Sequence, residues 1–496
     1  MTPSNRRSSH RSSTSAAALA LLVVTAAAPG LARGQAAKGS RYALGAMDGL
    51  PTDPVLQELI DESLAARPEL KQAEATVRAE RERVPQVGAL PDPTLSLGIQ
   101  NDGFDEIMVG EMETSFYQIM LSQPLPWPGK RGLREDVAEL AAEGAESDVA
   151  RLRLSTEAEV RRGYLDLLVV RERLALLDEL ERIWERSIGT ARARYEAGDG
   201  AQSDVMRAQL ELLRLRQRRW SLQAEEAARL QGLNRLRGKP LDAPIASSAS
   251  VRAQPLPALP ALDAATSDAE TRSPELAGAR TAASQADAQT RLARRERFPD
   301  VALQAGIMLR GKLDPMWTAG ISVGLPLWSG RKQSRAVAES EARASGSTLG
   351  AEAVLLTLHQ RVAERRSALA ALLETIDLFR KGLLVQSQAT TESALSQYRV
   401  GKVTFASVLD ANAGYLSDQE AHLLAVAEAQ RIAIATAEVS LDPAGGGGGG
   451  AMGGASVPGA GAAGGGSARG GGSGGATQGG APGAAPAAGG SMSGGM

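Results

Sequence analysis

The chain contains an internal duplication, and this feature limits its possible folds more than any other. Trp127-Pro-Gly-Lys-Arg opens a proline-free run that closes at Tyr195-Glu-Ala-Gly, and Trp328-Ser-Gly-Arg-Lys opens a second run that closes at Tyr398-Arg-Val-Gly. The opening and closing motifs are separated by nearly the same number of residues in both copies. Each copy therefore encodes one structural unit of fixed length, and the fold must accommodate that unit twice.

Proline spacing and composition predict that long helices dominate each unit. No proline occurs between Pro128 and Pro240 or between Pro326 and Pro443, and strong helix formers fill both stretches. A helix from Lys130 to Ala197 would be roughly 100 Å long at about 1.5 Å per residue. Gly198 and Gly401 can take the left-handed conformation that ends a helix, so each unit is expected to contain a helical hairpin.

Shorter helical segments precede the long helices. They run from Val55 to Val87 and from Asp263 to Arg297, and each carries an equivalent tetrad, Arg67-Pro-Glu-Leu or Ser273-Pro-Glu-Leu. Proline in the first turn is typical of a helix start. We expect these short helices to lie along the long one, although the helices alone fit an antiparallel coiled-coil rod of scaffold type equally well.

Segments between the helices have a period of two, which is typical of β-strands. Leu95, Leu97 and Ile99 alternate with small or polar residues, and residues 301–309 and 317–325 alternate in the same way. Strands of about ten residues with one apolar and one small polar face are typical of a membrane-spanning barrel with a wet lumen. Since four strands cannot close a barrel, closure would require other chains.

The expected organisation has five parts. Residues 1–36 resemble a secretory signal peptide, residues 53–240 and 263–441 form the two repeats, 241–262 link them, and 444–496 form a flexible tail rich in Gly, Ala and Ser. Within the repeats, the β-hairpins are expected at 93–125 and 300–327, and the long helical hairpins at 130–237 and 331–440. An exported chain whose only membrane segments are strands is expected in a bacterial outer membrane.

Composition excludes several classes of protein. The net charge of −2 and 3 % aromatic residues argue against a nucleic-acid partner and a large compact core, and the absence of cysteine excludes a disulfide framework. His10, His359 and His422 have no partners in a catalytic or zinc-binding motif, so we expect neither an enzyme nor a cofactor. Met108 and Met112 could contact soft metals, but methionine more often fills gaps, and we expect no metal site.

Three motifs resemble the outer-membrane efflux proteins of the TolC type over roughly residues 53–441. They are Ser122-Gln-Pro-Leu-Pro-Trp-Pro-Gly-Lys, Leu325-Pro-Leu-Trp-Ser-Gly-Arg, and Tyr398-Arg-Val-Gly-Lys followed by Val408-Leu-Asp-Ala. The resemblance implies a mainly α protein with a β membrane part, in which two tandem helix and β-hairpin repeats form a long periplasmic α-helical barrel. It also implies a homotrimer whose strands close one twelve-stranded barrel in outer-membrane lipid.

As for function, the resemblance implies a passive exit duct for small molecules or ions that docks on a periplasmic adaptor protein and an inner-membrane pump, expected to be of the RND type. Two alternatives stay open. One is an exported structural coiled-coil or surface protein, and the other is the duct of a type I protein secretion system. The sequence does not distinguish drugs, metal ions and polypeptides as cargo.

The resemblance also assigns roles to particular residues. The strand-to-helix junctions are expected at Trp127, Gly129, Lys130, Trp328, Gly330 and Arg331. The periplasmic hairpin tips, where partners dock, are expected at Tyr195, Gly198, Tyr398 and Gly401. The periplasmic constriction is expected at Asp410, Ser407 and Asp204.

The constriction departs from the family pattern at one position. Members of the family carry carboxylates just past the second tip, and the last of these falls on Asp410, whereas the neighbouring acidic position is Ser407. Asp204 stands at the matching place in the first repeat. The alternative is that Asp410 is an ordinary solvated charge on a helix.

Overall fold

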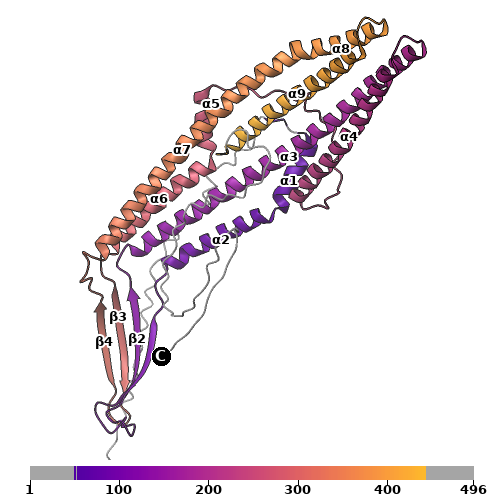
Figure 1. The fold of residues 1–496 in the computed structure, drawn as a ribbon. Coiled ribbons are helices and arrows are strands. Elements are labelled where there is room, and N and C mark those ends of the chain that lie inside the picture. The colour runs from indigo at the N-terminus through magenta and orange to yellow at the C-terminus, as the bar shows by residue number, and fades with distance from the viewer. Residues whose placement is uncertain (1–49, 52, 443–496) are drawn as a thin grey trace, which may run out of the picture. The chain divides into compact units, whose positions relative to one another are not determined.

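The computed structural model describes residues 50, 51 and 53–442, and most of these are helical (Figure 1). The signal peptide expected at 1–36 and the tail expected at 444–496 lie outside the described residues. None of the described helices combines the length and the apolar character needed to cross a membrane.

The same order of elements occurs twice along the chain. The first series is α1 (Pro54–Ala66), α2 (Pro68–Gly88), β1 (Thr94–Gln100), β2 (Phe116–Leu125), α3 (Lys130–Glu196) and α4 (Gln202–Arg237). The second series is α5 (Leu262–Arg272), α6 (Pro274–Arg295), β3 (Val301–Leu309), β4 (Met316–Val323), α7 (Gln333–Leu378), a π-helix η1 (Phe379–Leu383), α8 (Leu384–Arg399) and α9 (Phe405–Glu438).

Each short helical segment is divided in two at its tetrad. Arg67, between α1 and α2, and Ser273, between α5 and α6, have extended backbones with ψ angles of 117° and 111°. Each precedes a proline, whose ring disfavours the helical conformation in the residue before it. The proline then begins the next helix, where its missing N–H removes no hydrogen bond. The proline tetrads therefore divide the segments predicted at Val55–Val87 and Asp263–Arg297.

The two long helices differ in continuity. The helix predicted from Lys130 is α3, which runs unbroken for 67 residues. The corresponding helix of the second series is interrupted by the π-helix Phe379–Leu383, which separates α7 from α8. Gly382, a poor helix former, lies in this segment. π-Helices are rare and occur frequently at functional sites, so this interruption marks a position of interest.

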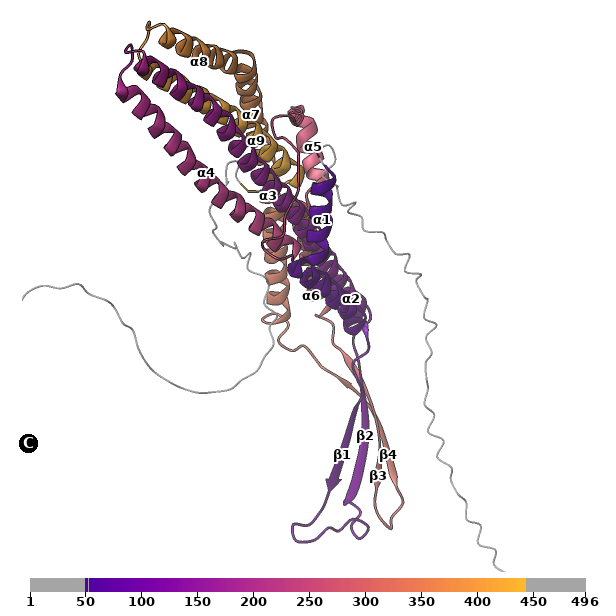
Figure 2. The same ribbon diagram turned by 90° about the vertical axis from the view of Figure 1, so that its right-hand side faces the viewer.

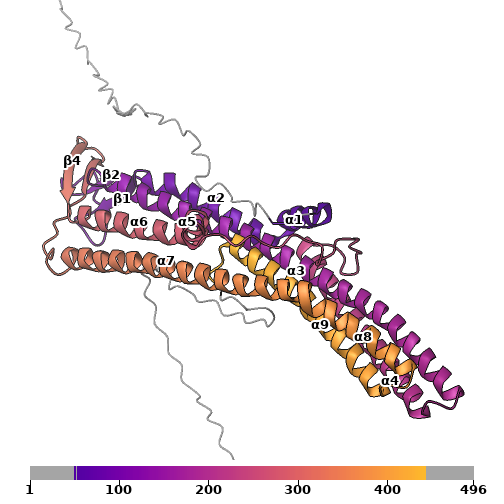
Figure 3. The same cartoon turned by 90° about the horizontal axis from the view of Figure 1, so that it is seen from above.

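Helix α3 is the central packing element. It contacts α2, α4, α6 and α9, while α7 packs against α6 and α9 (Figure 3). One cluster of buried apolar side chains includes Leu56, Leu168 and Leu423 and joins elements from both series. A second cluster lies nearer the helical hairpin turns and includes Trp184 and Phe405.

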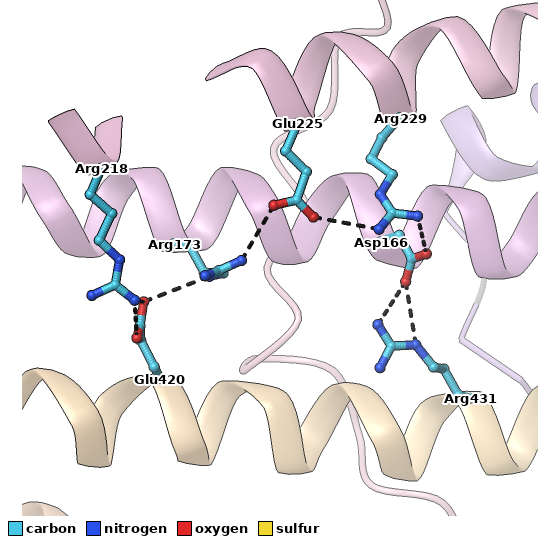
Figure 4. A network of polar contacts seen from close by, with 7 residues as sticks. All are labelled: Asp166, Arg173, Arg218, Glu225, Arg229, Glu420 and Arg431. Carbon is cyan, nitrogen blue, oxygen red and sulfur yellow. Dashed lines mark hydrogen bonds and ion pairs between the residues drawn. The ribbon is translucent and has the colours of Figure 1, made fainter. Parts of the chain in front are cut away.

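An ion-pair network also joins the two series of helices (Figure 4). Asp166 on α3 contacts Arg431 on α9 at 2.7 Å and Arg229 on α4 at 3.1 Å. Farther along the same helices, Glu420 on α9 contacts Arg173 on α3 at 3.6 Å and also pairs with Arg218 on α4. Glu225 links the two halves of the network through Arg173 and Arg229. The network ties α9 to both arms of the first helical hairpin.

The four strands form one antiparallel sheet in the order β1-β2-β3-β4 (Figure 2). The register aligns Leu97 with Ile119, Ile119 with Ile307, and Ile307 with Trp317 across all four strands. Because side chains alternate along a strand, these residues share one face. Leu97 is 73 % exposed and Trp317 is 80 % exposed. The sheet therefore presents an apolar face to its surroundings.

Candidate functional site at the hairpin tips and strand junctions

Both helical hairpins turn at a glycine in the left-handed conformation. Gly198 has a φ of 79° and Gly401 has a φ of 74°, which confirms the positive φ angles predicted for them. At the first turn, the N–H of Gly198 bonds to the carbonyl of Tyr195 at 3.0 Å and the N–H of Asp199 bonds to that of Arg194 at 2.9 Å. The second turn repeats this pair of bonds one for one. These are Schellman motifs, so local sequence determines where the hairpins turn.

The two hairpin turns are bonded to each other through Tyr398. Its hydroxyl donates a hydrogen bond of 2.9 Å to the carboxylate of Asp204, at the start of α4. The guanidinium of Arg194 lies 4.7 Å from the centre of the Tyr398 ring and also donates to the Tyr398 carbonyl. Tyr398 is only 2 % exposed and packs on Phe405. We call the contacts among Tyr398, Asp204 and Arg194 the tip bridge.

The tip bridge depends on a protonated tyrosine. Burial, together with the adjacent Asp204 carboxylate, raises the pKa of Tyr398 to about 12. The phenol therefore stays protonated at neutral pH and continues to donate its hydrogen bond. A phenolate would instead face a carboxylate, and the two like charges would repel each other.

A basic cavity of about 920 Å³ opens beside the tip bridge. Arg186 and Arg194 from α3 and Arg399 from the end of α8 line it, with Asp199 as its acidic member. Arg186 and Arg399 add positive charge beside Arg194, whose guanidinium is already bonded in the tip bridge, and this charge favours an anionic or acidic ligand. Partner docking is predicted at the tips from the sequence, but no sequence motif marks these arginines.

The structure places two of the three residues assigned to the constriction together and the third in a different environment. Asp410 and Ser407 are exposed on the first turns of α9, on the side opposite the buried Phe405 and Val408. Asp204 is partly buried, and its carboxylate accepts the hydrogen bond of the Tyr398 hydroxyl. Asp410 makes no ion pair within residues 53–442 and is therefore free to interact with ions or with another chain.

The first strand-to-helix junction is tied to the second series of elements. Lys130 is 3 % exposed, and its Nζ donates to the carbonyl of Phe298 and to Oδ1 of Asp300, both at 2.7 Å. The backbone N–H of Trp127 also donates to Asp300, and the Trp127 ring stacks on Phe298 at 5.5 Å. Gly129 has a φ of 90°, which only glycine adopts readily. Phe298 and Asp300 are not among the residues predicted for the junction, although an aromatic residue and an acid immediately before a strand are a usable signal.

The second junction is much more open. Trp328 is 74 % exposed, and Gly330 and Arg331 are exposed as well. Leu325 and Leu327, just before Trp328, are 70 % and 79 % exposed. The two junctions predicted to be equivalent therefore differ in burial, because within the described residues the first junction packs against other elements whereas the second is exposed.

The fold of the chain, with its long helical hairpins and its four-stranded sheet, is similar to that of solved outer-membrane channels. The outer-membrane channel OprN has a TM-score of 0.66 and 21 % identity, over 78 % of this chain and 90 % of OprN. CusC has a TM-score of 0.67 and 19 % identity, over 78 % of this chain and 92 % of CusC. At these identities the likeness concerns the fold.

The chain belongs to the outer membrane efflux protein family, whose family model matches residues 59–239 and 265–441. This confirms the resemblance inferred from the junction and tip motifs. The nickel-cobalt-cadmium resistance protein NccC of Alcaligenes xylosoxydans xylosoxydans is 26 % identical over 276 residues. That match covers 55 % of this chain and 61 % of NccC, so the chain spans less than two thirds of this relative.

Proposed function

We propose that this protein is the outer-membrane exit duct of a tripartite efflux system and acts as a homotrimer. One observation carries the proposal: a sheet with a broad exposed apolar face has two edge strands, β1 and β4, without a partner among the described residues. In a lipid bilayer every backbone polar group at such an edge must be hydrogen-bonded. A second copy of the chain can supply that partner, and three copies would give one closed barrel of twelve strands.

Exposed apolar side chains at the second junction support the same assembly. Leu325, Leu327 and Trp328 form a contiguous exposed group directly after β4, the edge strand that a neighbouring copy would pair with. Burying a side chain of this size contributes about 1.5–3 kcal/mol. A neighbouring copy that pairs with β4 would cover this group at the same time.

The tip bridge supports a gating role for the periplasmic end. Tyr398, Asp204 and Arg194 hold the second hairpin turn against the first, and the ion-pair network around Asp166 holds the same helices together farther from the tips. Separation of the turns would break the tip bridge and the apolar packing of Tyr398 and Phe405 at the tip, and it would leave the ion-pair network intact. We propose that the duct opens passively in this way when partners bind.

The partners are proposed on the chemistry of the tips. The basic cavity lined by Arg186, Arg194 and Arg399 suits acidic side chains at the end of an adaptor protein. An inner-membrane pump of the RND type would then supply energy and select the cargo. The name of NccC makes metal ions the first cargo to test, alongside small organic molecules.

Planar bilayer recordings test the proposal. We expect the purified protein to form channels of low conductance and Tyr398→Phe to raise that conductance, because the variant loses the hydrogen bond to Asp204. Tyr195→Phe is a matched control, since Tyr195 is the equivalent residue at the first tip and its hydroxyl has no hydrogen-bond partner among residues 53–442. Failure to form any channel, or a purely monomeric mass in mild detergent, would contradict the proposal.

A further inference from the structure

Methionines are concentrated in the two β-hairpins. Residues 50, 51 and 53–442 contain six methionines, and only Met206 lies in a helix. The other five lie in the strands or in the loop between β1 and β2: Met108, Met112, Met120, Met308 and Met316. Methionine is not favoured in strands by intrinsic propensity, so this concentration calls for a physical cause.

Strand register brings three of these side chains together on one face. Met308 on β3 is directly opposite Met316 on β4, and Met120 on β2 is directly opposite Gly306, two residues before Met308. Directly opposed residues have Cβ atoms about 4.5–5.5 Å apart, and diagonal neighbours are still within reach of long side chains. Since Ile119, Ile307 and Trp317 occupy the other face, the three thioethers share the face opposite the apolar one.

This face is not an apolar core that needs gap-filling side chains. Most neighbours of the three methionines on it are polar or small, namely Gln118, Ser122, Gln304 and Thr318, with Gly306 and Gly320. Phe116, two residues before Gln118 and so diagonal to Met308, is a large apolar neighbour. Met316 is 41 % exposed, and Met120 and Met308 are only partly buried. Packing against Phe116 can account for Met308, but this usual reason for methionine does not explain Met120 and Met316.

Charge in the adjoining loop favours cations. The loop between β1 and β2 contains five carboxylates and no basic side chain: Asp102, Asp105, Glu106, Glu111 and Glu113. It touches the loop after β3, because a Cβ added at Gly311 would lie 2.7 Å from the Cα of Gly110. The acidic loop thus lies close to the strand ends that carry Met308 and Met316. The loop between Met308 and Met316 adds Asp314 but also the basic Arg310 and Lys312. The two loops together thus carry six carboxylates and two basic side chains, and this net charge of −4 raises the local concentration of cations beside the thioethers.

We infer that Met308 and Met316, with Met120 beside them, form a binding site for a soft monovalent cation, Cu(I) or Ag(I). Thioether sulfur is a soft neutral ligand that selects such ions, whereas Ni²⁺ and Co²⁺ favour imidazole, carboxylate or water. Without a thiolate the site would bind weakly and exchange quickly, as an ion on a conduction path requires. The location of the site inside the duct rests on the proposed function, whereas the binding of the cation by these methionines does not.

Equilibrium dialysis of the detergent-solubilised full chain against Ag(I) tests the inference. Nitrate buffer is needed because chloride precipitates silver. Met308→Leu combined with Met316→Leu keeps the side-chain volume and removes both sulfurs, so we expect Ag(I) affinity to fall by about tenfold or more. Met206→Leu is the matched control and should bind like the unmodified protein. Equal binding by the double variant and the control would overturn the inference.

Oxidation mapping gives a readout that needs no variant. Mild peroxide converts exposed methionine to its sulfoxide, and a bound cation occupies the sulfur lone pairs that react. We expect Ag(I) to slow oxidation of Met308 and Met316 and leave Met206 unaffected, as measured by peptide mass spectrometry. Uniform protection of all methionines, or none, would show that the site does not exist.

Bilayer recordings separate this inference from the proposed function. If the protein forms channels and micromolar Ag(I) blocks them less in the double variant than in the Met206→Leu control, both stand. If channels form but Ag(I) acts equally on both variants, the site is absent from the duct and the efflux proposal is unaffected. If no channel forms while Ag(I) still binds through Met308 and Met316, the site stands and the duct proposal fails.

Discussion

Nζ of Lys130 lies 2.7 Å from Oδ1 of Asp300, and this ion pair ties the start of α3 to the start of β3. The lysine side chain is 4 % exposed and the aspartate side chain is 49 % exposed, so the two partners differ in their access to water. Asp300 also accepts from the backbone N–H of Trp127, and this bond and the ion pair together hold its pKa below the usual range despite partial burial.

The first prediction follows from that difference in exposure. Asp300→Ala leaves the buried ammonium with only the Phe298 carbonyl and removes the acceptor of the Trp127 N–H, so it should lower the free energy of unfolding by about 3 kcal/mol. Lys130→Met leaves a half-exposed carboxylate that water can solvate, and it should cost less. Thermal denaturation in detergent measures both.

Asp148→Ala, which removes a surface ion pair of 3.8 Å with Arg151, is the control and should change stability by under about 0.5 kcal/mol. The reverse ranking, with Lys130→Met the more damaging, would contradict the argument.

The bounds of α3 are predictable from the sequence because local signals encode both of its ends. Gly129 and Gly198 take positive φ angles on either side of a long proline-free run, and those signals act over a few residues. Lys130 and Asp300 are 170 residues apart in the chain, and Tyr398 and Asp204 are 194 apart. Such pairs depend on how the two series of elements pack, which no local pattern specifies.

The second prediction concerns the glycines of the hairpin turns. Gly198→Val and Gly401→Val force a β-branched residue into the left-handed region at about 1–2 kcal/mol each. A Cβ added at Gly198 meets nothing within 4 Å, so backbone strain is the main effect there. We expect normal outer-membrane levels with lost export. Gly414→Ala, in the interior of α9 with open space around it, is the control and should keep export. Loss of membrane insertion in the valine variants would show that these turns matter to the whole fold.

The π-helix Phe379–Leu383 is a feature that the sequence did not reveal, because a run of strong helix formers predicts a continuous helix and Gly382 is a weak interruption. The buried His422 beside it was equally hidden. The centre of its ring lies 6.0 Å from that of Phe379, and the residue is only 5 % exposed. Within residues 53–442 neither ring nitrogen has a hydrogen-bond partner. Helical periodicity placed His422 on a helix but could not reveal what packs against it.

The third prediction is an acid sensitivity caused by His422. Burial, with Arg380 and Arg252 nearby and Glu172 opposing them, holds the pKa of His422 below its ordinary value of 6.5. Above that value the histidine is neutral in both folded and unfolded chains and has no effect on stability. As the pH falls below it, the unfolded chain takes up a proton first, so stability decreases until the lower folded pKa is reached.

Denaturation temperatures at about pH 7.5 and about pH 5.5 measure this sensitivity, on either side of the ordinary histidine pKa. His422→Leu should reduce the loss of stability at the lower pH. Phe379→Leu alters the same contact but keeps the imidazole, so it should retain the acid sensitivity. An unchanged pH dependence in His422→Leu would assign the effect to other groups.

The last prediction concerns Asp410, which is exposed and unpaired within residues 53–442 and lies one helical turn beyond Ser407 on the same face of α9. In a trimer, three such carboxylates around a narrow axis would attract cations and repel one another. Asp410→Ala should therefore weaken cation preference and block by multivalent cations in planar bilayers.

Ser407→Asp adds a second carboxylate on the same face and should strengthen both the cation preference and the block. Opposite shifts from these two variants would distinguish a constriction from a general loss of folding, because a misfolded tip would not gain selectivity. If neither variant changed selectivity or block, Asp410 would be an ordinary solvated charge on a helix.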